Sequence, residues 1–467
     1  MADISKVNSF ISWLRSKGGH FHESAELKVD PETGLSPFST SPIGPDERLV
    51  SCPFDLAITP ELATQAICEI ANVAEEQLVW PAESSSRQGE KWNARMRIGA
   101  YLGLHWIYQE KLSEDSSFPP ALQHLEYLES LPPPTSLTTP LYFSPAELEL
   151  LKGSTLYGGV KARQEEWKAE CEVVRKLLKE DGLTWDRYLA TSTYMSSRSF
   201  PSKLLHIPDR ADSQAHEAKK EDGDEQSQPV LLPGLDLFNH SRGQPILWLS
   251  SLIPSTTSSA QPIPSISLVS TQPTEKGVQL YNNYGPKSNE ELLLGYGFVI
   301  PANPDDTLTL KLGISNIPLG KLDKLKSKGL DPDRRFDLRK DGEMDKNLLE
   351  ILRIILNEHD HHDHEHEEID EEDEHALHAQ EEREMQLELD VLGMLGGMLD
   401  DKLEKLQGNH EGKDVNGEVR EEIRNMCEVY KQCQVDILNA AMDKLSERIE
   451  RIEGLIDEGM GECPCGC

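Results

Sequence analysis

The sequence has no uninterrupted apolar run near the ~20 residues that a membrane-spanning helix needs. Its first residues alternate polar and apolar side chains, unlike the charged and apolar blocks of a secretory signal peptide. Cysteine is sparse: the chain has eight, and three of them stand at 463, 465 and 467. This scatter indicates reduced thiols and argues against a disulfide framework. We therefore expect a soluble protein of the cytoplasm or the nucleus.

Basic residues are scarce relative to acidic ones. The chain carries 47 lysines and arginines against 82 aspartates and glutamates, which gives a formal net charge of −35. Phosphate binding needs clustered Lys and Arg, so a broad nucleic-acid-binding face is excluded. A negative surface instead attracts positively charged partners. We expect a monomer that acts on a basic protein, with no direct contact with nucleic acid or membrane.

Hydrophobic periodicity divides the chain into alternating β-rich and helical parts. A polar, charged linker and an acidic, histidine-rich insert have compositions typical of disorder. The predicted parts are 1–59, β-rich; 60–185, a helical insert; 186–313, β-rich, with the flexible linker at 209–228; 314–457, helical, with the histidine-rich insert at 358–384; and 458–467, a cysteine-rich tail.

One short stretch, 277–300, combines a strand, a turn, a helix and two aromatic residues. Its start is strand-like at Val278–Leu280, and Asn, Gly and Pro then supply turn chemistry around Tyr284. Ser288 or Asn289 can cap the helix that follows, and Gly295 is predicted to end it. A phenol in such a turn can point its hydroxyl into a cleft, although aromatic residues in this setting more often pack in a core.

Three unlike motifs occur in a fixed order along the chain. They are Ser-Arg-Ser-Phe at 197–200, Asp-Leu-Phe-Asn-His-Ser at 236–241, and Tyr-Gly-Pro-Lys-Ser-Asn-Glu-Glu-Leu-Leu-Leu-Gly-Tyr-Gly-Phe at 284–298. This order resembles the SET-domain methyltransferases of the Rubisco large-subunit methyltransferase class, which includes fungal ribosomal-protein lysine methyltransferases. The resemblance implies an α+β fold: a β-rich SET domain with a long helical insert, followed by an all-helical substrate-binding domain.

The resemblance also implies S-adenosylmethionine as cofactor and a protein lysine as methyl acceptor. Tyr284 matches the family's catalytic tyrosine, and Tyr296 is expected to form the other wall of the lysine channel. A bulk lysine has a pKa near ~10.4, so its amine must lose a proton before it attacks the methyl group. The positions that match cofactor-binding residues are Gly34, Arg198, Phe200, Asp236, Asn239, His240 and Phe298.

One motif departs from the family pattern. Members usually carry Gly-x-Gly near the start of the SET domain, against the methionine part of the cofactor. Here the corresponding residues are Gly34, Leu35 and Ser36. We expect the serine in place of the second glycine to reshape or weaken the cofactor pocket.

Several alternative functions remain open at this stage. A degenerate pocket would suit a non-catalytic protein-binding module, and a related branch of the family methylates histidine. Histidines at 359–366 and cysteines at 463–467 could bind metal, but a floppy acidic segment lacks fixed ligand geometry and the terminal cysteines are too tightly spaced. We therefore predict no functional metal site and favour a lysine methyltransferase acting on a ribosomal protein or translation factor.

Overall fold

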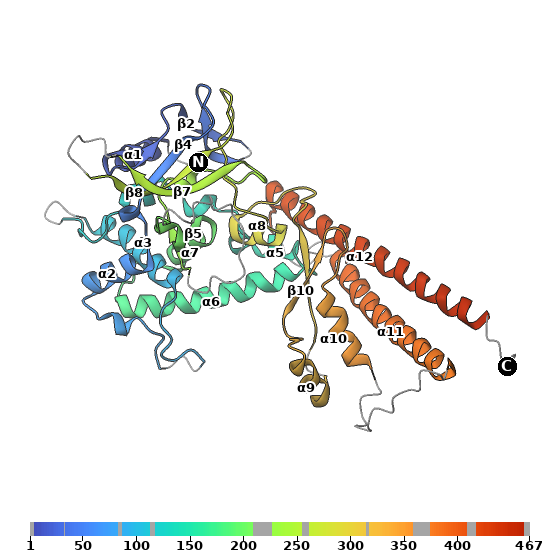
Figure 1. Ribbon diagram of the computed structural model, residues 1–467. Helices are drawn as coiled ribbons and strands as arrows, with labels where there is room; N and C mark the ends of the chain where they lie inside the picture. Colours follow the sequence, from blue (N-terminus) through green and yellow to red (C-terminus); the bar gives the residue numbers. More distant parts are fainter. Residues whose placement is uncertain are drawn as a thin grey trace. The chain divides into compact units, whose positions relative to one another are not determined.

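The computed structural model describes residues 4–31, 33–82, 86–112, 117–208, 227–254, 261–313, 317–357, 374–408 and 417–461 (Figure 1). The chain forms two compact units. Unit 1 comprises Met1–Thr138 and Lys161–Pro286, and unit 2 comprises Thr139–Val160 and Lys287–Cys467. Unit 2 therefore takes up two separate stretches of the chain, and the predicted domain boundaries stay a prediction.

Unit 1 contains the β-rich parts. Its largest sheet has the order β1-β4-β8-β7, and every neighbouring pair in it is antiparallel. Two further pairs, β2 with β3 and β5 with β6, are also antiparallel. The strands are β1 (His20–Phe21), β2 (Ala25–Asp30), β3 (Gly34–Ser39), β4 (Glu47–Pro53), β5 (Ser199–Pro201), β6 (Pro229–Leu231), β7 (Ile246–Ile253) and β8 (Ile263–Ser270).

The helices of unit 1 lie before β1 and between β4 and β5 in the sequence. They are α1 (Ile4–Ser16), α2 (Pro60–Ala71), α3 (Ala94–Lys111), α4 (Leu125–Ser130), the greater part of α6 (Thr155–Leu178) and α7 (Trp185–Arg198). Helix α1 buries Val7, Phe10, Ile11 and Leu14, the residues whose spacing predicted it. Helix α3 packs against both α2 and α7. It is buried on most of its faces, so it belongs to a core rather than to the surface.

Unit 2 is mainly helical, but it also contains a two-stranded sheet that the sequence analysis missed. Strand β9 (Thr307–Lys311) pairs antiparallel with β10 (Arg335–Arg339). Leu308, Leu310, Phe336 and Leu338 face the core from this hairpin. The prediction of an all-helical C-terminal part is therefore wrong in this detail, although the predicted α+β class is confirmed.

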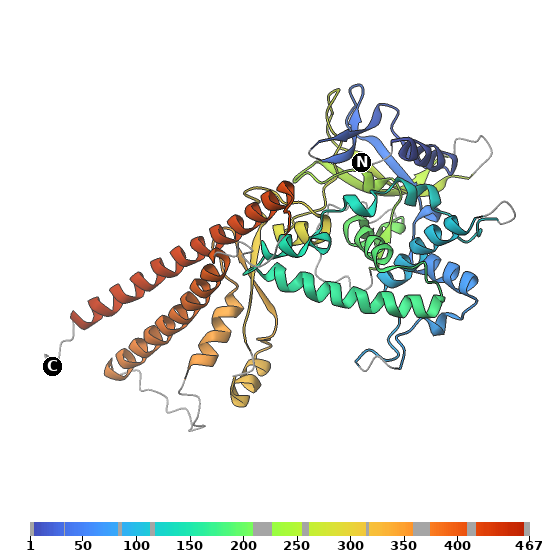
Figure 2. The same ribbon diagram turned by 180° about the vertical axis from the view of Figure 1, so that it is seen from behind.

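Within the described residues, the α-helices that lie wholly in unit 2 are α5 (Pro145–Glu149), α8 (Asn289–Tyr296), α9 (Leu319–Ser327), α10 (Lys346–Leu356), α11 (Glu374–Gln407) and α12 (Glu421–Gly461). Four of them, α9 to α12, share one hydrophobic core with this hairpin. Helices α11 and α12 lie side by side in both views (Figures 1 and 2). Each presents an apolar stripe, with Leu395 and Leu399 from α11 and Ile437 and Leu438 from α12.

The predicted disorder of 358–384 is wrong for the part of this insert that belongs to α11. The acidic composition of 358–384 indicated disorder, but residues from Glu374 onward are helical. The earlier part of that insert lies outside the described residues, as do most of the 209–228 linker and the cysteines at 463–467. Within the described ranges, no helix is long and apolar enough to cross a membrane, and the cysteines there form no disulfide.

The structure also changes what was predicted for the stretch 277–300. Val278–Leu280 forms no regular strand, and only an isolated bridge joins Gln279 to Phe38. Ser288 caps α8 as predicted, and its capping box is completed by Glu291. The helix ends at Gly297 and not at Gly295, because Gly297 takes the left-handed conformation, with φ of 82°, that closes a helix.

A buried carboxylate joins α5 to the start of α12 within unit 2. Both oxygens of Glu147 accept hydrogen bonds from the Arg420 side chain, at 2.8 and 2.9 Å, and the Glu147 side chain is only 2% exposed. Burial alone would raise the pKa of Glu147, but the bonds from Arg420 and from the Ser144 amide outweigh it and lower that pKa to about 2.

We expect Glu147→Gln to lower the free energy of unfolding by about 2 kcal/mol at neutral pH, a value reduced for the partial exposure of Arg420. The lowered pKa stabilises the fold above the unfolded value of 4.5, and this contribution disappears as the pH falls towards about 2. Denaturant unfolding followed by circular dichroism measures the difference. The exposed Glu421 provides a matched control, and an equal loss in Glu421→Gln would contradict the prediction.

Candidate functional site

Two distant segments of unit 1 meet at the centre of the candidate site. His240 forms a parallel bridge with Asn282. The Asn282 amide donates to the carbonyl oxygen of Asn239 at 2.8 Å, and the Ser241 amide donates to the carbonyl oxygen of Asn282 at 2.9 Å. In such a bridge the N–H and C=O of His240 point to the opposite side. The motif at 236–241 and the turn before Tyr284 therefore form one unit of backbone.

Tyr284 is held in this turn by three contacts. Its hydroxyl donates to the carbonyl oxygen of Phe238 at 3.1 Å, and its amide donates to Nδ1 of His240 at 3.0 Å. Its ring also stacks on the His240 ring, with centroids 5.1 Å apart and planes 21° apart. Because Nδ1 accepts a hydrogen bond, the neutral His240 ring carries its proton on Nε2. The same contacts thus fix both the position of the Tyr284 phenol and the tautomer of the His240 imidazole.

Arg198 and Asp236 form a buried ion pair near Tyr284. Arg198 donates from one nitrogen to the Asp236 carboxylate at 3.0 Å and to the Asp236 carbonyl oxygen at 2.9 Å. Burial opposes the charge of Arg198, but the Asp236 carboxylate outweighs it and raises the pKa of the guanidinium. The charge of Arg198 is also close enough to Tyr284 for the two groups to interact electrostatically.

Both oxygens of the Asp236 carboxylate accept hydrogen bonds from protein donors. One oxygen accepts from the Gly234 amide at 3.1 Å, and the other accepts from Arg198 and from the Tyr127 hydroxyl at 3.0 Å. The side chain has no exposed area. This geometry favours Asp236 as the group that holds Arg198. A direct contact of Asp236 with the cofactor stays a prediction.

The groups that hold the Asn239 side chain were not predicted from the sequence. Nδ2 of Asn239 donates to the Ser36 hydroxyl at 2.7 Å and to the Thr33 carbonyl oxygen at 3.0 Å. Ser36 is fully buried on β3. No sequence pattern indicated this contact, because the two partners are about two hundred positions apart.

Two buried donors beside this centre have no hydrogen-bond partner among the described residues. They are Nε2 of Gln279 and Nδ2 of Asn282, which precede Tyr284 in the same segment. Gln279 is 9% exposed and Asn282 is fully buried. An unpaired buried N–H costs about 1–3 kcal/mol unless a ligand or water accepts from it. These two side-chain N–H groups therefore need hydrogen-bond acceptors. A purine ring, a ribose or a carboxylate group of a ligand can provide them.

Two other predicted residues of unit 1 have clear local roles. Gly34 is the first residue of β3, directly after the β2–β3 turn, where its φ of 72° favours glycine. It is exposed, and a Cβ added there would meet no atom within 4 Å. Phe200 is 6% exposed and packs edge-on against Trp248, with centroids 5.2 Å apart. Their predicted contacts with the cofactor stay predictions.

The two remaining predicted residues, Tyr296 and Phe298, belong to unit 2. Their rings contact each other edge-on at 6.2 Å between centroids. Lys287 places its ammonium 5.6 Å from the Tyr296 ring centre. Burial and the neighbouring Glu291 raise the pKa of Tyr296 to about 12, so its phenol is protonated at neutral pH. The role of Tyr296 as a wall of the lysine channel stays a prediction.

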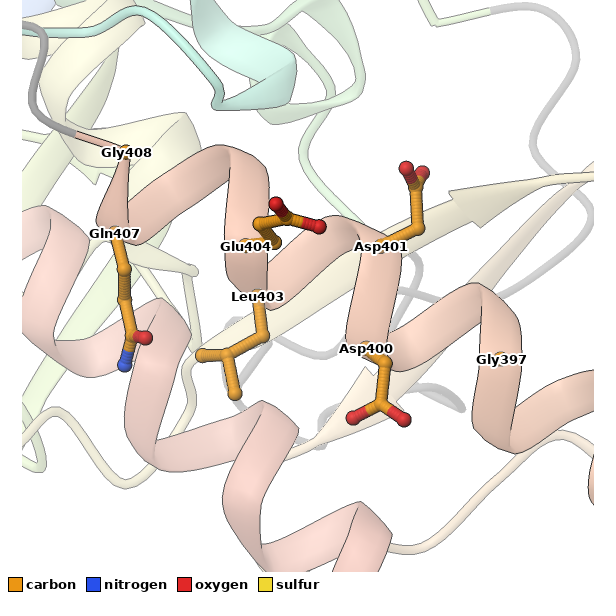
Figure 3. A pocket seen from close by; sticks show the side chains of 7 residues that line it. All are labelled: Gly397, Asp400, Asp401, Leu403, Glu404, Gln407 and Gly408. Carbon is orange, nitrogen blue, oxygen red and sulfur yellow. The ribbon is translucent and has the colours of Figure 1, made fainter.

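A pocket on α11 contains none of these residues (Figure 3). It is lined by Gly397, Asp400, Asp401, Leu403, Glu404, Gln407 and Gly408. Asp400 and Asp401 point in opposite directions in Figure 3, so they do not converge on one ligand. Across the described ranges no group of three His, Cys, Asp or Glu side chains is placed to hold a metal ion. We therefore locate the candidate site at Asn239, His240 and Tyr284.

Comparison with known proteins finds methyltransferases among the proteins that this chain is similar to. No protein-family model matches the chain. It is 35% identical over 274 residues to ribosomal lysine N-methyltransferase set10 of Schizosaccharomyces pombe, which covers 58% of this chain and 41% of that protein. It is 22% identical over 343 residues to actin-histidine N-methyltransferase of Drosophila melanogaster, which covers 67% of this chain and 52% of that protein. The chain thus matches about half the length of these relatives.

The structural match covers more of this chain than the sequence matches do. The solved structure of Rubisco LSMT bound to AdoMet superposes with a TM-score of 0.62 at 20% sequence identity. The match covers 96% of this chain and 93% of that chain. At this identity the superposition shows a shared fold.

Proposed function

We propose that this chain belongs to the SET-domain class that includes Rubisco LSMT and is an S-adenosylmethionine-dependent protein-lysine N-methyltransferase. The observation that carries the proposal is the fixed phenol of Tyr284. Its hydroxyl donates to Phe238, and its ring and amide are fixed by His240. This matches the position of the family's catalytic tyrosine in the 284–298 motif.

The residues around Asn239 fit an adenosyl cofactor. The bridge to Asn282 directs the backbone groups of His240 to one side, where they can pair with the edge of a purine. The unpaired donors of Gln279 and Asn282 add to the demand for acceptors near the same backbone. S-adenosylmethionine would supply a methyl group on a positively charged sulfur.

The residues around Tyr284 can prepare the acceptor amine. A hydroxyl that donates to the Phe238 carbonyl presents its own oxygen as an acceptor for an amine N–H. Such a bond would orient the nitrogen lone pair, and positioning of this kind lowers a reaction barrier by several kcal/mol.

The substrate is proposed from chemistry and from the names of relatives. The relative set10 is named a ribosomal lysine N-methyltransferase. Ribosomal proteins are basic, and the net charge of −35 would attract them. We therefore infer a ribosomal protein or translation factor as substrate, methylated by a monomeric enzyme in the cytoplasm or nucleus.

Protein-histidine methylation is the second candidate, because a relative is named an actin-histidine N-methyltransferase. A non-catalytic binding module is a third. Calorimetric titration of the full chain with S-adenosylmethionine tests the proposal against that third candidate. We expect saturable binding with one cofactor per chain, and no heat of binding at millimolar cofactor would overturn the proposal.

A further inference from the structure

We propose that Ser36 is a positioning residue of the cofactor site, because its hydroxyl orients the Asn239 amide. This inference rests on the proposed function. It also reverses the expectation from the sequence, where the serine in place of a glycine predicted a weakened pocket. In the structure the serine provides a contact that a glycine cannot make.

The contacts fix which way the Asn239 amide faces. The carbonyl oxygen of Thr33 can only accept a hydrogen bond, so the Asn239 atom 3.0 Å from it must be the nitrogen. The second proton on the same nitrogen goes to the Ser36 hydroxyl at 2.7 Å. Both protons of the amide are therefore used by the β2–β3 turn and β3. The Oδ1 atom consequently faces away from β3, where it can accept from a donor such as the exocyclic amine of adenine.

A hydrogen-bond network extends from Ser36 towards the turn that contains Tyr284. The Ser36 and Thr33 hydroxyls lie 3.2 Å apart, and Thr33 also contacts Oε1 of Gln279 at 3.2 Å. Tyr281 donates to the same Gln279 oxygen at 2.9 Å. The amide of Gln279 thus has its oxygen fixed, while its nitrogen is buried and has no partner in the part of the chain that the structure describes. Ser36 therefore connects two amide side chains that flank the candidate site.

Removing the hydroxyl should loosen the Asn239 amide without disturbing Tyr284. With glycine or alanine at position 36, Nδ2 keeps only the Thr33 carbonyl oxygen, and the amide gains rotational freedom. We expect Ser36→Gly and Ser36→Ala to weaken binding of S-adenosylmethionine about tenfold, the usual effect of one lost hydrogen bond to a neutral group. The KM for the cofactor should rise by the same factor, while kcat should change less than twofold.

A buried serine on the same strand provides the matched control. The Ser39 hydroxyl donates to the carbonyl oxygens of Glu275 and Val278 and makes no contact with Asn239. Ser39→Ala removes the same atom from a similarly buried position. It should leave the cofactor Kd within twofold. All seven tryptophans lie in unit 1, so tryptophan fluorescence verifies that each variant is folded before titration.

The double variant Ser36→Ala with Asn239→Ala completes the experiment. If Ser36 acts through Asn239, the serine change should add less than twofold to the Kd of the single Asn239→Ala variant. Unchanged or tighter cofactor binding in Ser36→Gly would overturn the inference alone. So would an equal loss in Ser39→Ala, or full additivity in the double variant. Absence of cofactor binding by the unaltered chain would overturn both the inference and the proposed function.

Discussion

Replacing Tyr284 by phenylalanine should lower kcat at least a hundredfold while the Kd for S-adenosylmethionine stays within about tenfold. The hydroxyl is the only group removed, so the ring can still stack on His240 and the amide can still donate to it. The lost oxygen is the proposed acceptor for the substrate amine. Single-turnover methyl transfer and calorimetry on the same preparation separate the two effects.

Tyr194→Phe is the control for this experiment. Tyr194 also donates its hydroxyl to a backbone carbonyl, that of Pro132, within the same unit. Its removal should cost stability without lowering kcat more than twofold. Full activity in Tyr284→Phe would eliminate Tyr284 as the catalytic tyrosine, and an equal loss in Tyr194→Phe would attribute the effect to general damage.

Acid should destabilise unit 1 strongly, because two buried histidines must take up protons on unfolding. His105 and His124 are both fully buried in the helical part. Burial is the main cause that lowers the pKa of His105 to about 4 and that of His124 to about 3. Their ring nitrogens are paired as neutral groups: His105 with the Tyr101 carbonyl oxygen, and His124 with the Tyr101 hydroxyl and the Leu56 carbonyl oxygen.

The direction of the effect follows from these lowered pKa values. Above the unfolded value of 6.5 both states are neutral and the histidines cost nothing. As the pH falls below 6.5, the unfolded chain binds two protons that the folded chain does not. Between pH 6.5 and 4.5 we expect these two groups to remove about 5 kcal/mol from the free energy of unfolding.

Replacing one histidine isolates its contribution. His124→Gln should be less stable at neutral pH, because glutamine cannot satisfy both Tyr101 and Leu56. The slope of unfolding free energy against pH should fall by about 1.4 kcal/mol per pH unit, one proton, between pH 6 and 4.5. Denaturant titrations followed by tryptophan fluorescence report unit 1. The exposed His206→Gln is the control, and an unchanged slope in His124→Gln would contradict the account.

Local signals in the sequence predicted much of the fold. The apolar spacing of α1 was sufficient to predict that helix, and the capping residue Ser288 was sufficient to indicate where α8 begins. Each signal depends only on neighbours a few positions away. The hairpin of β9 and β10 was missed although its signal was present. Its Arg335–Arg339 strand alternates exposed and buried residues, a period of two, within a region that otherwise has helical spacing.

The candidate site could be predicted only in part. The motif residues Asn239, His240 and Tyr284 were predicted together. In the structure His240 contacts Tyr284, and the Asn239 carbonyl oxygen accepts from Asn282 in the same turn. The roles of Ser36 and Asp236 depend on partners far away in the chain, such as Asn239 for Ser36 and Tyr127 for Asp236. Burial and hydrogen-bond occupancy decide such roles, and neither can be read from one segment of sequence.

The most direct test of the proposed function is labelled-methyl transfer into a lysate from cells that lack this protein. The purified chain and labelled S-adenosylmethionine are added, and the labelled protein is identified by mass spectrometry. Tyr284→Phe serves as the inactive control. The account predicts one major labelled band, a basic protein that carries methyl-lysine. Methyl-histidine in that band, or no labelling above the Tyr284→Phe control, would contradict it.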